Sequence, residues 1–380
     1  MPPDSKRRLP IVTGWLARGL AVVLILGGVR AAPVMVTLGP PQQVETEHPL
    51  TCVHTRLMDE VEEWKIKHSL ELAREMGATT IVEFFPWPYI EPARGQYNWA
   101  QADRVIAHAR TQGLRVIARL GMVPAWAQPD ADTLDFDLTL NYLEEDAFPD
   151  FAAFVEAFTA RYAGDVEAVI IWNEPNLAFE WGYQPPDPAR YARLLALAGP
   201  AAKRGSPDVR VLAGALAPTL EPEGSPYGTN ELDYLRGLYE AGAADWFDAL
   251  AIHTYGFRFP PEEPPAPDVL NFRRAELLRA IMVEYGDGDK PVYITEAGWN
   301  DHPRWTKAVR PGQRITYTLE AYQMVEAEWP WAETMCLWVF RTPTLSYSYH
   351  DYFSLVTPGF TERPIYDALK GWARGTNSAP

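Results

Sequence analysis

Short β-rich runs alternate along the chain with longer segments in which apolar residues recur every three or four positions. The run from Ala168 to Trp172 has no polar position, which is typical of a strand buried on both faces of a parallel sheet. Eight such runs, each followed by a segment of helical period, predict consecutive β-strand and α-helix units. The predicted strands are residues 51–57, 79–85, 114–120, 168–172, 209–214, 249–253, 292–296 and 335–340.

The segments between these runs have the period of helices with one buried face. Asp187 followed by Pro188 supplies a capping side chain and a proline suited to the first helical position, so we expect a helix to begin there. Apolar spacing predicts the buried faces of two other helices, Phe151, Phe154, Phe158 and Tyr162 in one and Val61, Trp64, His68, Leu72 and Met76 in the other.

The number and order of these elements predict an α/β fold of the (β/α)₈ TIM barrel type. A chain of 380 residues is long enough, because such barrels need about 250 residues. No Gly-x-Gly-x-x-Gly turn follows the first strand, which disfavours a dinucleotide-binding open sheet. We therefore expect one catalytic domain over residues 45–380, with a cleft walled by insertions after the third, fifth and sixth strands (residues 121–150, 215–230 and 256–268).

Residues 1–44 have the pattern of an export signal followed by a short linker. Lys6, Arg7 and Arg8 supply positive charge, and an uncharged, mostly aliphatic run extends from Gly19 to Val29. The run is short for a membrane span, which needs roughly 20 apolar residues, so we expect cleavage, with retention as a membrane anchor as the alternative. Either outcome places the domain outside the cytoplasm, secreted or at the cell surface.

Charge and cysteine content narrow the partners and the compartment. The formal net charge is −16, which repels phosphate backbones and anionic lipids, so nucleic acid is not expected as a partner. Two cysteines, Cys52 and Cys336, do not make a disulfide framework. They fall on the first and last predicted strands, which barrel closure makes neighbours. We expect them to be buried free thiols unless their Cβ atoms approach within about 4.5 Å.

Two glutamates end predicted strands. The sequence Trp172-Asn173-Glu174-Pro175-Asn176 follows the fourth strand, and Thr295-Glu296-Ala297 ends the seventh. In a barrel these carboxylates point into one cleft from opposite sides, which is the arrangement that glycosyl transfer by double displacement needs. Either glutamate alone would often be structural, as a helix cap or an ion-pair partner. We expect burial to raise the pKa of Glu174, and hydrogen-bond donors to keep Glu296 ionised.

With these motifs, the chain resembles the clan of retaining glycoside hydrolases that carry catalytic glutamates after barrel strands four and seven, family 39 and family 5 above all. The resemblance implies that Glu174 is the general acid/base and Glu296 the nucleophile, cleaving a β-linked glycoside of an oligo- or polysaccharide. It implies substrate contacts for Asn173, His253, Tyr255 and Trp338, with the Tyr255 hydroxyl bonding the nucleophile and Trp338 forming the floor of the −1 subsite.

Other residues are weaker candidates for substrate contact. Glu83 follows the second strand, and Trp299 lies on a presumed loop beside Glu296. The arginine that family 5 carries near strand two has no clear counterpart, and Arg56 and Arg119 are the two candidates for its place. For both arginines and Glu83, ion pairing inside the barrel is the favoured interpretation. Of the loop tryptophans Trp87, Trp126, Trp181 and Trp299, we expect about half to contact sugar.

No metal or cofactor is expected, because no His-Glu-x-x-His or paired-cysteine spacing accompanies His54 and His253. For His54 we expect a core, hydrogen-bonded role. Two other functions remain open. A non-catalytic carbohydrate-binding barrel at the cell surface would keep an aromatic cleft without matched carboxylates, and a transglycosylase would use the same residues as a hydrolase. Membrane contact is expected only through the possible N-terminal anchor.

Overall fold

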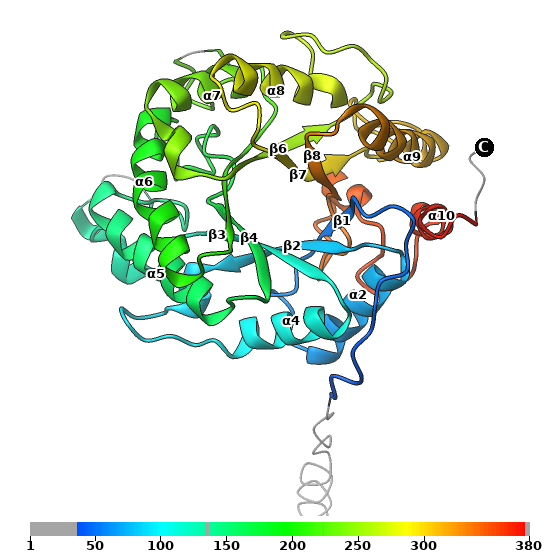
Figure 1. Ribbon diagram of the computed structural model, residues 1–380, viewed down its shortest axis with the longest axis horizontal. Coiled ribbons are helices and arrows are strands. Elements are labelled where there is room, and N and C mark those ends of the chain that lie inside the picture. The colour runs from blue at the N-terminus through cyan, green and yellow to red at the C-terminus, as the bar shows by residue number, and fades with distance from the viewer. Residues whose placement is uncertain (1–35, 134–136, 223, 377–380) are drawn as a thin grey trace, which may run out of the picture. The chain divides into compact units, whose positions relative to one another are not determined.

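The computed structural model describes residues 36–133, 137–222 and 224–376. In these ranges eight parallel strands close into a barrel in sequence order, with β1 paired to both β2 and β8. Helices lie around the ring of strands (Figure 1). The (β/α)₈ TIM barrel predicted from the sequence is confirmed. The strands are β1 (Thr51–His54), β2 (Thr80–Pro86), β3 (Arg115–Gly121), β4 (Val166–Ile171), β5 (Arg210–Leu216), β6 (Ala249–Tyr255), β7 (Val292–Gly298) and β8 (Ala332–Leu337).

The helices follow the strands as the alternation predicted. The Asp187 side chain accepts hydrogen bonds from the backbone N–H groups of Ala189 and Arg190, so the predicted cap of α6 is confirmed. The longer helices described are α2 (Glu63–Glu75), α4 (Ala100–Thr111), α5 (Phe148–Arg161), α6 (Pro188–Gly205), α7 (Glu231–Glu240), α8 (Ala275–Glu284), α9 (Pro311–Glu328) and α10 (Pro364–Ala373), with one turn at α3 (Trp87–Ile90).

One predicted helix face is confirmed, and the other is confirmed only for Leu72 and Met76, which are buried. Phe151, Phe154 and Phe158 of α5 are fully buried, as expected. In α2 the buried residues are Ile66, Ser69, Leu70, Leu72 and Ala73, whereas Val61 and Trp64 are exposed. The spacing of Val61 and Trp64 was misleading because α2 begins only at Glu63, after Val61.

Two apolar clusters lie on the two faces of the strands. Alternate residues of each strand point into the barrel or out toward the helices, and the inner cluster is composed of small and medium side chains apart from Tyr293. Its members are Cys52, Val82, Ile117, Ala168, Ile170, Leu212, Ala215, Ala249, Ala251, Tyr293 and Cys336. The outer cluster joins the strands to the helices and is much larger. The barrel interior is therefore packed with side chains below its carboxyl-end mouth.

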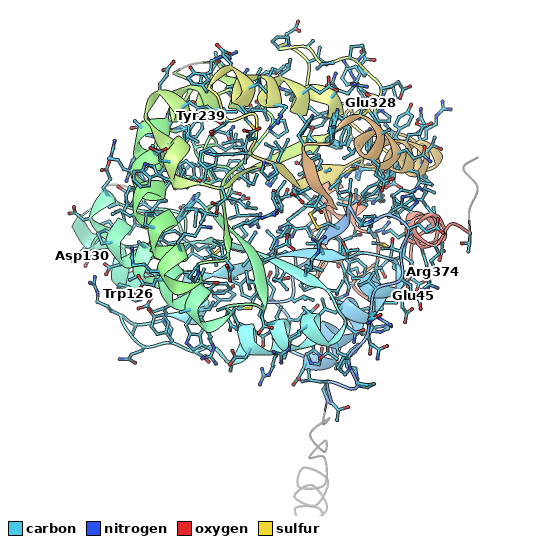
Figure 2. The ribbon with its side chains drawn as sticks, in the orientation of Figure 1. Glu45, Trp126, Asp130, Tyr239, Glu328 and Arg374 are labelled. Carbon is cyan, nitrogen blue, oxygen red and sulfur yellow. A yellow bond between two sulfur atoms is a disulfide. The ribbon has the colours of Figure 1, made fainter. Side chains whose placement is uncertain are left out.

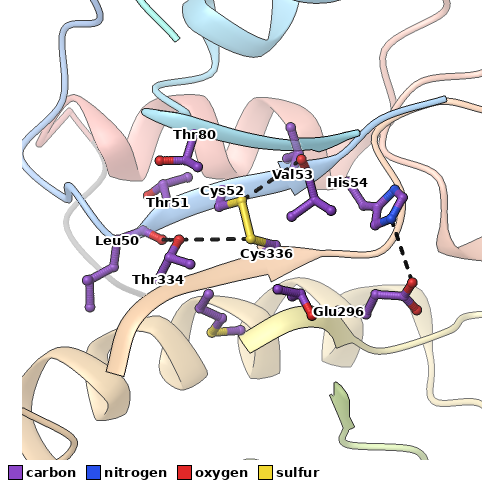
Figure 3. Close-up of a disulfide and its surroundings, with 12 residues drawn as sticks. Leu50, Thr51, Cys52, Val53, His54, Thr80, Glu296, Thr334 and Cys336 are labelled. Atoms are coloured by element: carbon purple, nitrogen blue, oxygen red, sulfur yellow. Dashed lines mark hydrogen bonds and ion pairs between the residues drawn. A yellow bond between two sulfur atoms is a disulfide. The ribbon is translucent and has the colours of Figure 1, made fainter. Parts of the chain in front are cut away.

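Cys52 and Cys336 form a disulfide inside the barrel (Figure 3). The two residues are register partners on β1 and β8, and both are fully buried. The expected burial and strand adjacency are confirmed, and of the two alternatives the disulfide is formed and not the free thiols. Parallel register brings their Cα atoms to 4.1 Å, close enough for the sulfur atoms to bond.

The amino-terminal prediction lies outside the described residues, because residues 1–35 carry the charged and aliphatic runs. Within the described ranges, no helix has both the length and the apolar character needed to cross a membrane. From Leu38 onward, the described residues belong to one compact unit.

Candidate active site

Glu174 and Glu296 both lie at the carboxyl end of the barrel. Trp172 and Glu174, just after β4, have positive φ angles of 74° and 42°, which turn the chain sharply away from the strand. The Glu174 N–H donates to the Ala215 carbonyl at 3.1 Å and thereby anchors this turn to β5. Glu296 lies within β7, near its end. The sequence prediction of two strand-end carboxylates at one mouth is thus matched by the placement of both side chains.

The two carboxylates approach each other around His253. One oxygen of Glu174, one oxygen of Glu296 and a His253 ring nitrogen all lie within 4.8 Å of one another. His253 Nδ1 is 2.7 Å from Glu174 Oε1 and 3.6 Å from Glu296 Oε2. Burial lowers the pKa of His253 to about 4, so its ring is neutral at pH 7 and bridges the pair without adding charge.

Both oxygens of Glu296 have hydrogen-bond donors. The Tyr255 hydroxyl donates to Oε2 at 2.6 Å, and Arg119 Nη1 donates to Oε1 at 3.0 Å. Arg119 also donates to Asn173 Oδ1 at 2.8 Å and lies over the Phe84 ring at 4.8 Å. These contacts fix the nucleophile candidate in one orientation and place a positive charge beside it.

The two glutamates differ in how their charge is stabilised. Burial raises the pKa of Glu174 to about 7, although Arg119 opposes this shift. Burial also raises the pKa of Glu296, while the Arg119 charge and the Tyr255 hydrogen bond lower it. Because Arg119 and Tyr255 donate directly to Glu296, the negative charge of the pair resides on Glu296 and the proton on Glu174. The raised pKa expected for Glu174 is confirmed.

A cavity of about 400 Å³ opens over these groups, within the range of small-molecule sites. Segments after β1, β3, β4 and β8 wall it. The loop after β3 supplies Met122 and Asn141, the loop after β4 supplies Phe179 and Glu180, and the segment after β8 supplies His350. The further lining residues are Arg56, Phe84, Arg119, Gly121, Trp172, Asn173, Glu174, Tyr255, Glu296 and Trp338.

The cleft walls differ from those predicted. The insertion after β3 contributes as expected, but the described residues of the insertions after β5 and β6 do not line the cavity. Instead, the β5 insertion packs against the β4 loop, where Leu177 and Gly228 form an antiparallel bridge. The loop after β5 therefore supports the wall formed by the loop after β4.

Three predicted substrate contacts, His253, Glu83 and Trp299, are not among the residues that line the cavity. His253 is buried between the two glutamates, and the other two have separate surroundings. Val82 points into the barrel interior, so the next residue, Glu83, points to the opposite face. There its carboxylate accepts from the Thr55 hydroxyl at 2.5 Å and from the backbone N–H groups of Leu57 and Met58, each at 2.9 Å. Burial raises the pKa of Glu83 to about 7. Through these hydrogen bonds Glu83 stabilises the loop after β1, which is a structural role.

Trp299 is buried and covers a backbone turn. Its indole N–H donates to the Phe259 carbonyl at 2.7 Å, and a Cβ atom on Gly256 would overlap its ring. The other loop tryptophans also miss the cavity. Trp87 and Trp181 are fully buried, and Trp126 lies far from the barrel centre, near Asp130 (Figure 2). None of the four tryptophans lines this cavity, whereas Trp338 does, as the resemblance implied.

Ion pairing was the favoured interpretation for Arg56 and Arg119, and a buried, hydrogen-bonded role was expected for His54. Arg56 pairs with Asp59 at 2.6 Å, and Arg119 pairs with Glu296, yet both arginines line the cavity. His54 is buried, with Nδ1 bonded to the Thr55 carbonyl at 3.0 Å, as expected. Its Nε2 lies 3.7 Å from Glu296 Oε1, as Figure 3 shows.

The cluster of Glu174, His253 and Glu296 has the donor atoms of a metal site. However, both Glu296 oxygens already accept hydrogen bonds, one of them from the Arg119 guanidinium. A cation bound there would face the positive charge of Arg119 at close range. The donor set therefore fits an acid/base pair better than a metal centre.

Comparison with known proteins places the fold among glycoside hydrolases. Residues 57–134 match the family model Glyco_hydro_42, described as beta-galactosidase, whereas no curated protein matches the chain. A family 39 glycoside hydrolase from the gut symbiont Bacteroides cellulosilyticus is similar with a TM-score of 0.66 and 21% identity. GH5_18 from Streptomyces cattleya, in complex with GlcNAc, has a TM-score of 0.62 and 16% identity, over 88% of this chain and 82% of that one.

The family 39 match covers 88% of this chain, but this chain spans only 65% of that protein. A beta-galactosidase from the psychrophilic Marinomonas ef1 has a TM-score of 0.55 and 12% identity, over 85% of this chain and 59% of that one. These likenesses confirm the resemblance that the motifs implied, to the (β/α)₈ glycoside hydrolase clan that includes families 39 and 5. The chain thus has the fold of that clan.

Proposed function

We propose that this protein is a retaining glycoside hydrolase that cleaves a β-linked glycoside, with Glu296 as nucleophile and Glu174 as general acid/base. The observation that carries the proposal is the approach of their carboxylate oxygens to within 4.8 Å. Retaining enzymes hold their carboxyl groups about 5 to 5.5 Å apart, whereas inverting enzymes leave about 6.5 to 9.5 Å for a water molecule. The spacing supports a direct attack by one carboxylate.

The first step follows from the protonation states. Glu296, ionised beside Arg119 and Tyr255, attacks the anomeric carbon, while Glu174 donates its proton to the leaving oxygen. The glycosidic bond breaks, the leaving group departs as an alcohol, and a glycosyl ester forms on Glu296. Glu174 is left ionised, next to the neutral His253 ring at 2.7 Å.

The second step reverses the roles. Glu174 removes a proton from water, the water oxygen attacks the anomeric carbon, and the ester bond to Glu296 breaks. The sugar leaves with its original anomeric configuration, and both glutamates return to their first states. A sugar hydroxyl in place of water would give transglycosylation with the same residues.

A substrate screen tests the proposal. Purified protein should hydrolyse at least one member of a panel of aryl β-glycosides and β-linked oligosaccharides, whereas Glu296→Ala should not. Glu333→Ala is the matched control, because Glu333 is an exposed residue at the start of β8, far from the mouth of the barrel. Sugar binding by both proteins without turnover of any panel member would support the carbohydrate-binding barrel instead.

The pH dependence of kcat/KM should be bell-shaped. The pKa of Glu174 is raised to about 7 by burial, so activity should fall as the pH rises through about 7 and the acid loses its proton. Activity should also fall at low pH, where Glu296 becomes protonated. Because burial raises the pKa of Glu296, this acidic limb of the pH profile should lie above the ordinary pKa of a glutamate. In Glu174→Gln, assayed with an activated aryl glycoside, the alkaline limb should disappear; an unchanged limb would assign it to another group.

We further propose that the protein acts outside the cytoplasm. The Cys52–Cys336 disulfide supports this proposal, because disulfides persist in oxidising compartments and are rare in the cytosol. Cell fractionation with an antibody to the barrel should find the protein in the medium or at the cell surface. Recovery in the cytosolic fraction with both cysteines reduced would contradict it.

A further inference from the structure

Phe179 is an aromatic residue of the cavity that neither step of the proposed reaction uses. It lies five residues after Glu174, in the loop between β4 and α6, and it lines the cavity with 49% of its surface exposed. A ring that faces a cavity leaves apolar surface in water, and a ligand with an apolar face can cover that surface. Sugar rings present such a face of C–H groups to aromatic rings.

The next residue, Glu180, is a partly buried carboxylate that also lines the cavity. Arg56 and Arg119, the two arginines of the cavity, form ion pairs with Asp59 and Glu296 rather than with Glu180. A carboxylate in such surroundings is costly unless hydrogen-bond donors reach it. The hydroxyl groups of a sugar are such donors, whereas an alkyl or lipid chain has none. An aromatic ring followed by a carboxylate therefore suits a sugar ring better than a purely apolar group.

Phe179 and Glu180 lie on the side of the cavity toward which the leaving group departs. In the closed barrel β4 and β8 are opposite each other, so the loop after β4 faces the segment after β8 across the mouth. Trp338, which lines the cavity directly after β8, is the expected floor under the sugar that is attacked. Glu174, which protonates the leaving oxygen in the proposed reaction, belongs to the same loop as Phe179. The leaving group therefore extends from Glu174 toward Phe179.

Hydrogen bonds between two loops hold this wall in place before a substrate arrives. Asn141 Nδ2 donates to the Phe179 carbonyl at 3.4 Å and to Glu180 Oε2 at 3.3 Å. The Trp172 indole N–H donates to the Glu180 carbonyl at 2.8 Å. The loops also pack closely, because a Cβ atom on Gly182 would lie 2.8 Å from the Asn141 carbonyl oxygen. A wall that is already ordered loses little conformational entropy when a sugar binds.

We propose that Phe179 and Glu180 form a leaving-group subsite for a sugar, whose ring stacks on Phe179 and whose hydroxyl groups donate to the Glu180 carboxylate. The natural substrate is then a di- or oligosaccharide and not a glycoside of a simple alcohol or a lipid. Binding at this subsite holds the glycosidic oxygen beside Glu174, so its energy contributes to the first step of the reaction. This inference rests on the proposed function.

Two substrates that share one glycone test the subsite, a β-linked disaccharide from the substrate panel and the corresponding glycosyl fluoride. Fluoride departs without a ring, so the second substrate leaves the subsite empty. Phe179→Ala and Glu180→Ala should each lower kcat/KM for the disaccharide on the order of 10- to 100-fold, while kcat/KM for the fluoride stays at the wild-type value. Tyr347→Ala is the matched control, because Tyr347 is 91% exposed and is not among the residues that line the cavity. It should match the wild type on both substrates.

Three results would overturn this inference while leaving the proposed function intact. Equal losses on both substrates would mean that the two residues act on the attacked sugar or on the fold, and not on the leaving group. Wild-type kinetics of either variant on the disaccharide would remove that residue from the subsite. Turnover of the fluoride and of alkyl glycosides, but of no disaccharide, would assign the wall to an apolar leaving group. A folded wild type that turns over neither the fluoride nor any other glycoside would overturn the proposed function as well.

Discussion

Replacing Glu296 with alanine should lower kcat by at least about 10⁴-fold on every glycoside, because Glu296 is the group that forms the glycosyl ester in the proposed reaction. Glu174→Ala should behave differently. With a good leaving group such as dinitrophenol, which departs without protonation, the first step should survive, and the second step should slow by about 10²- to 10⁴-fold for want of a base. Stopped-flow assays of dinitrophenol release should therefore show a burst in Glu174→Ala and none in Glu296→Ala.

The leaving group supplies an internal control for this pair of variants. An alkyl glycoside needs protonation to depart, so Glu174→Ala should lose both steps on it. Equal losses on the aryl and alkyl glycosides in Glu174→Ala would argue against its role as the acid. A residual burst in Glu296→Ala would mean that another group is the nucleophile.

Removal of the interior disulfide should lower the free energy of unfolding by about 3 to 5 kcal/mol. The Cys52–Cys336 bond closes a loop with a sequence separation of 284 residues, and cross-links over long loops restrict the unfolded chain most. The same bond joins β1 and β8, where the barrel closes. Differential scanning calorimetry of the Cys52→Ala/Cys336→Ala variant should show a Tm that is lower by about 10 °C.

Reduction of the wild type separates the cross-link from side-chain packing. The reduced protein keeps both sulfur atoms, so it should lose stability without the small cavities that alanine leaves. Reductant should not change the Tm of the alanine variant. Equal Tm values for the oxidised and reduced wild type, with reduction verified by mass spectrometry, would show that the disulfide contributes no stability.

The strands were predictable from the sequence because a strand that is buried on both faces shows this in its own run of apolar residues. A run such as 168–172 is apolar throughout because one face packs inside the barrel and the other against helices. Eight such runs with helices between them leave few arrangements other than a closed barrel. The register was not predictable, and register decides that Cys52 meets Cys336.

Strand alternation also carries information about which residues reach the site. Ile117 points into the barrel, so Arg119, two residues later, points the same way at the mouth, where it pairs with Glu296. By the same rule Glu83 follows the inward Val82 and must point outward. Alternation would therefore have favoured Arg119 over Glu83 as a residue of the cavity.

The loops were the least predictable part. The path of the segment after β4 depends on its contacts with two other insertions, at Asn141 and at the bridge between Leu177 and Gly228. Sequence patterns carry no information on such long-range packing. They therefore do not identify Glu180 and Phe179 as residues of the cavity. The tryptophans were predicted as sugar contacts from the size of their rings alone.

The roles of Glu174 and Glu296 are tested most directly by the configuration of the glycosyl azide that each alanine variant forms. Azide needs no base, so in Glu174→Ala it should attack the ester on Glu296 and give the β-glycosyl azide from a β-linked aryl substrate. In Glu296→Ala it should take the place of the missing carboxylate and give the α-glycosyl azide. Proton NMR of the two products distinguishes the anomers. The same anomer from both variants, or the reverse assignment, would contradict the division of labour proposed for the two glutamates.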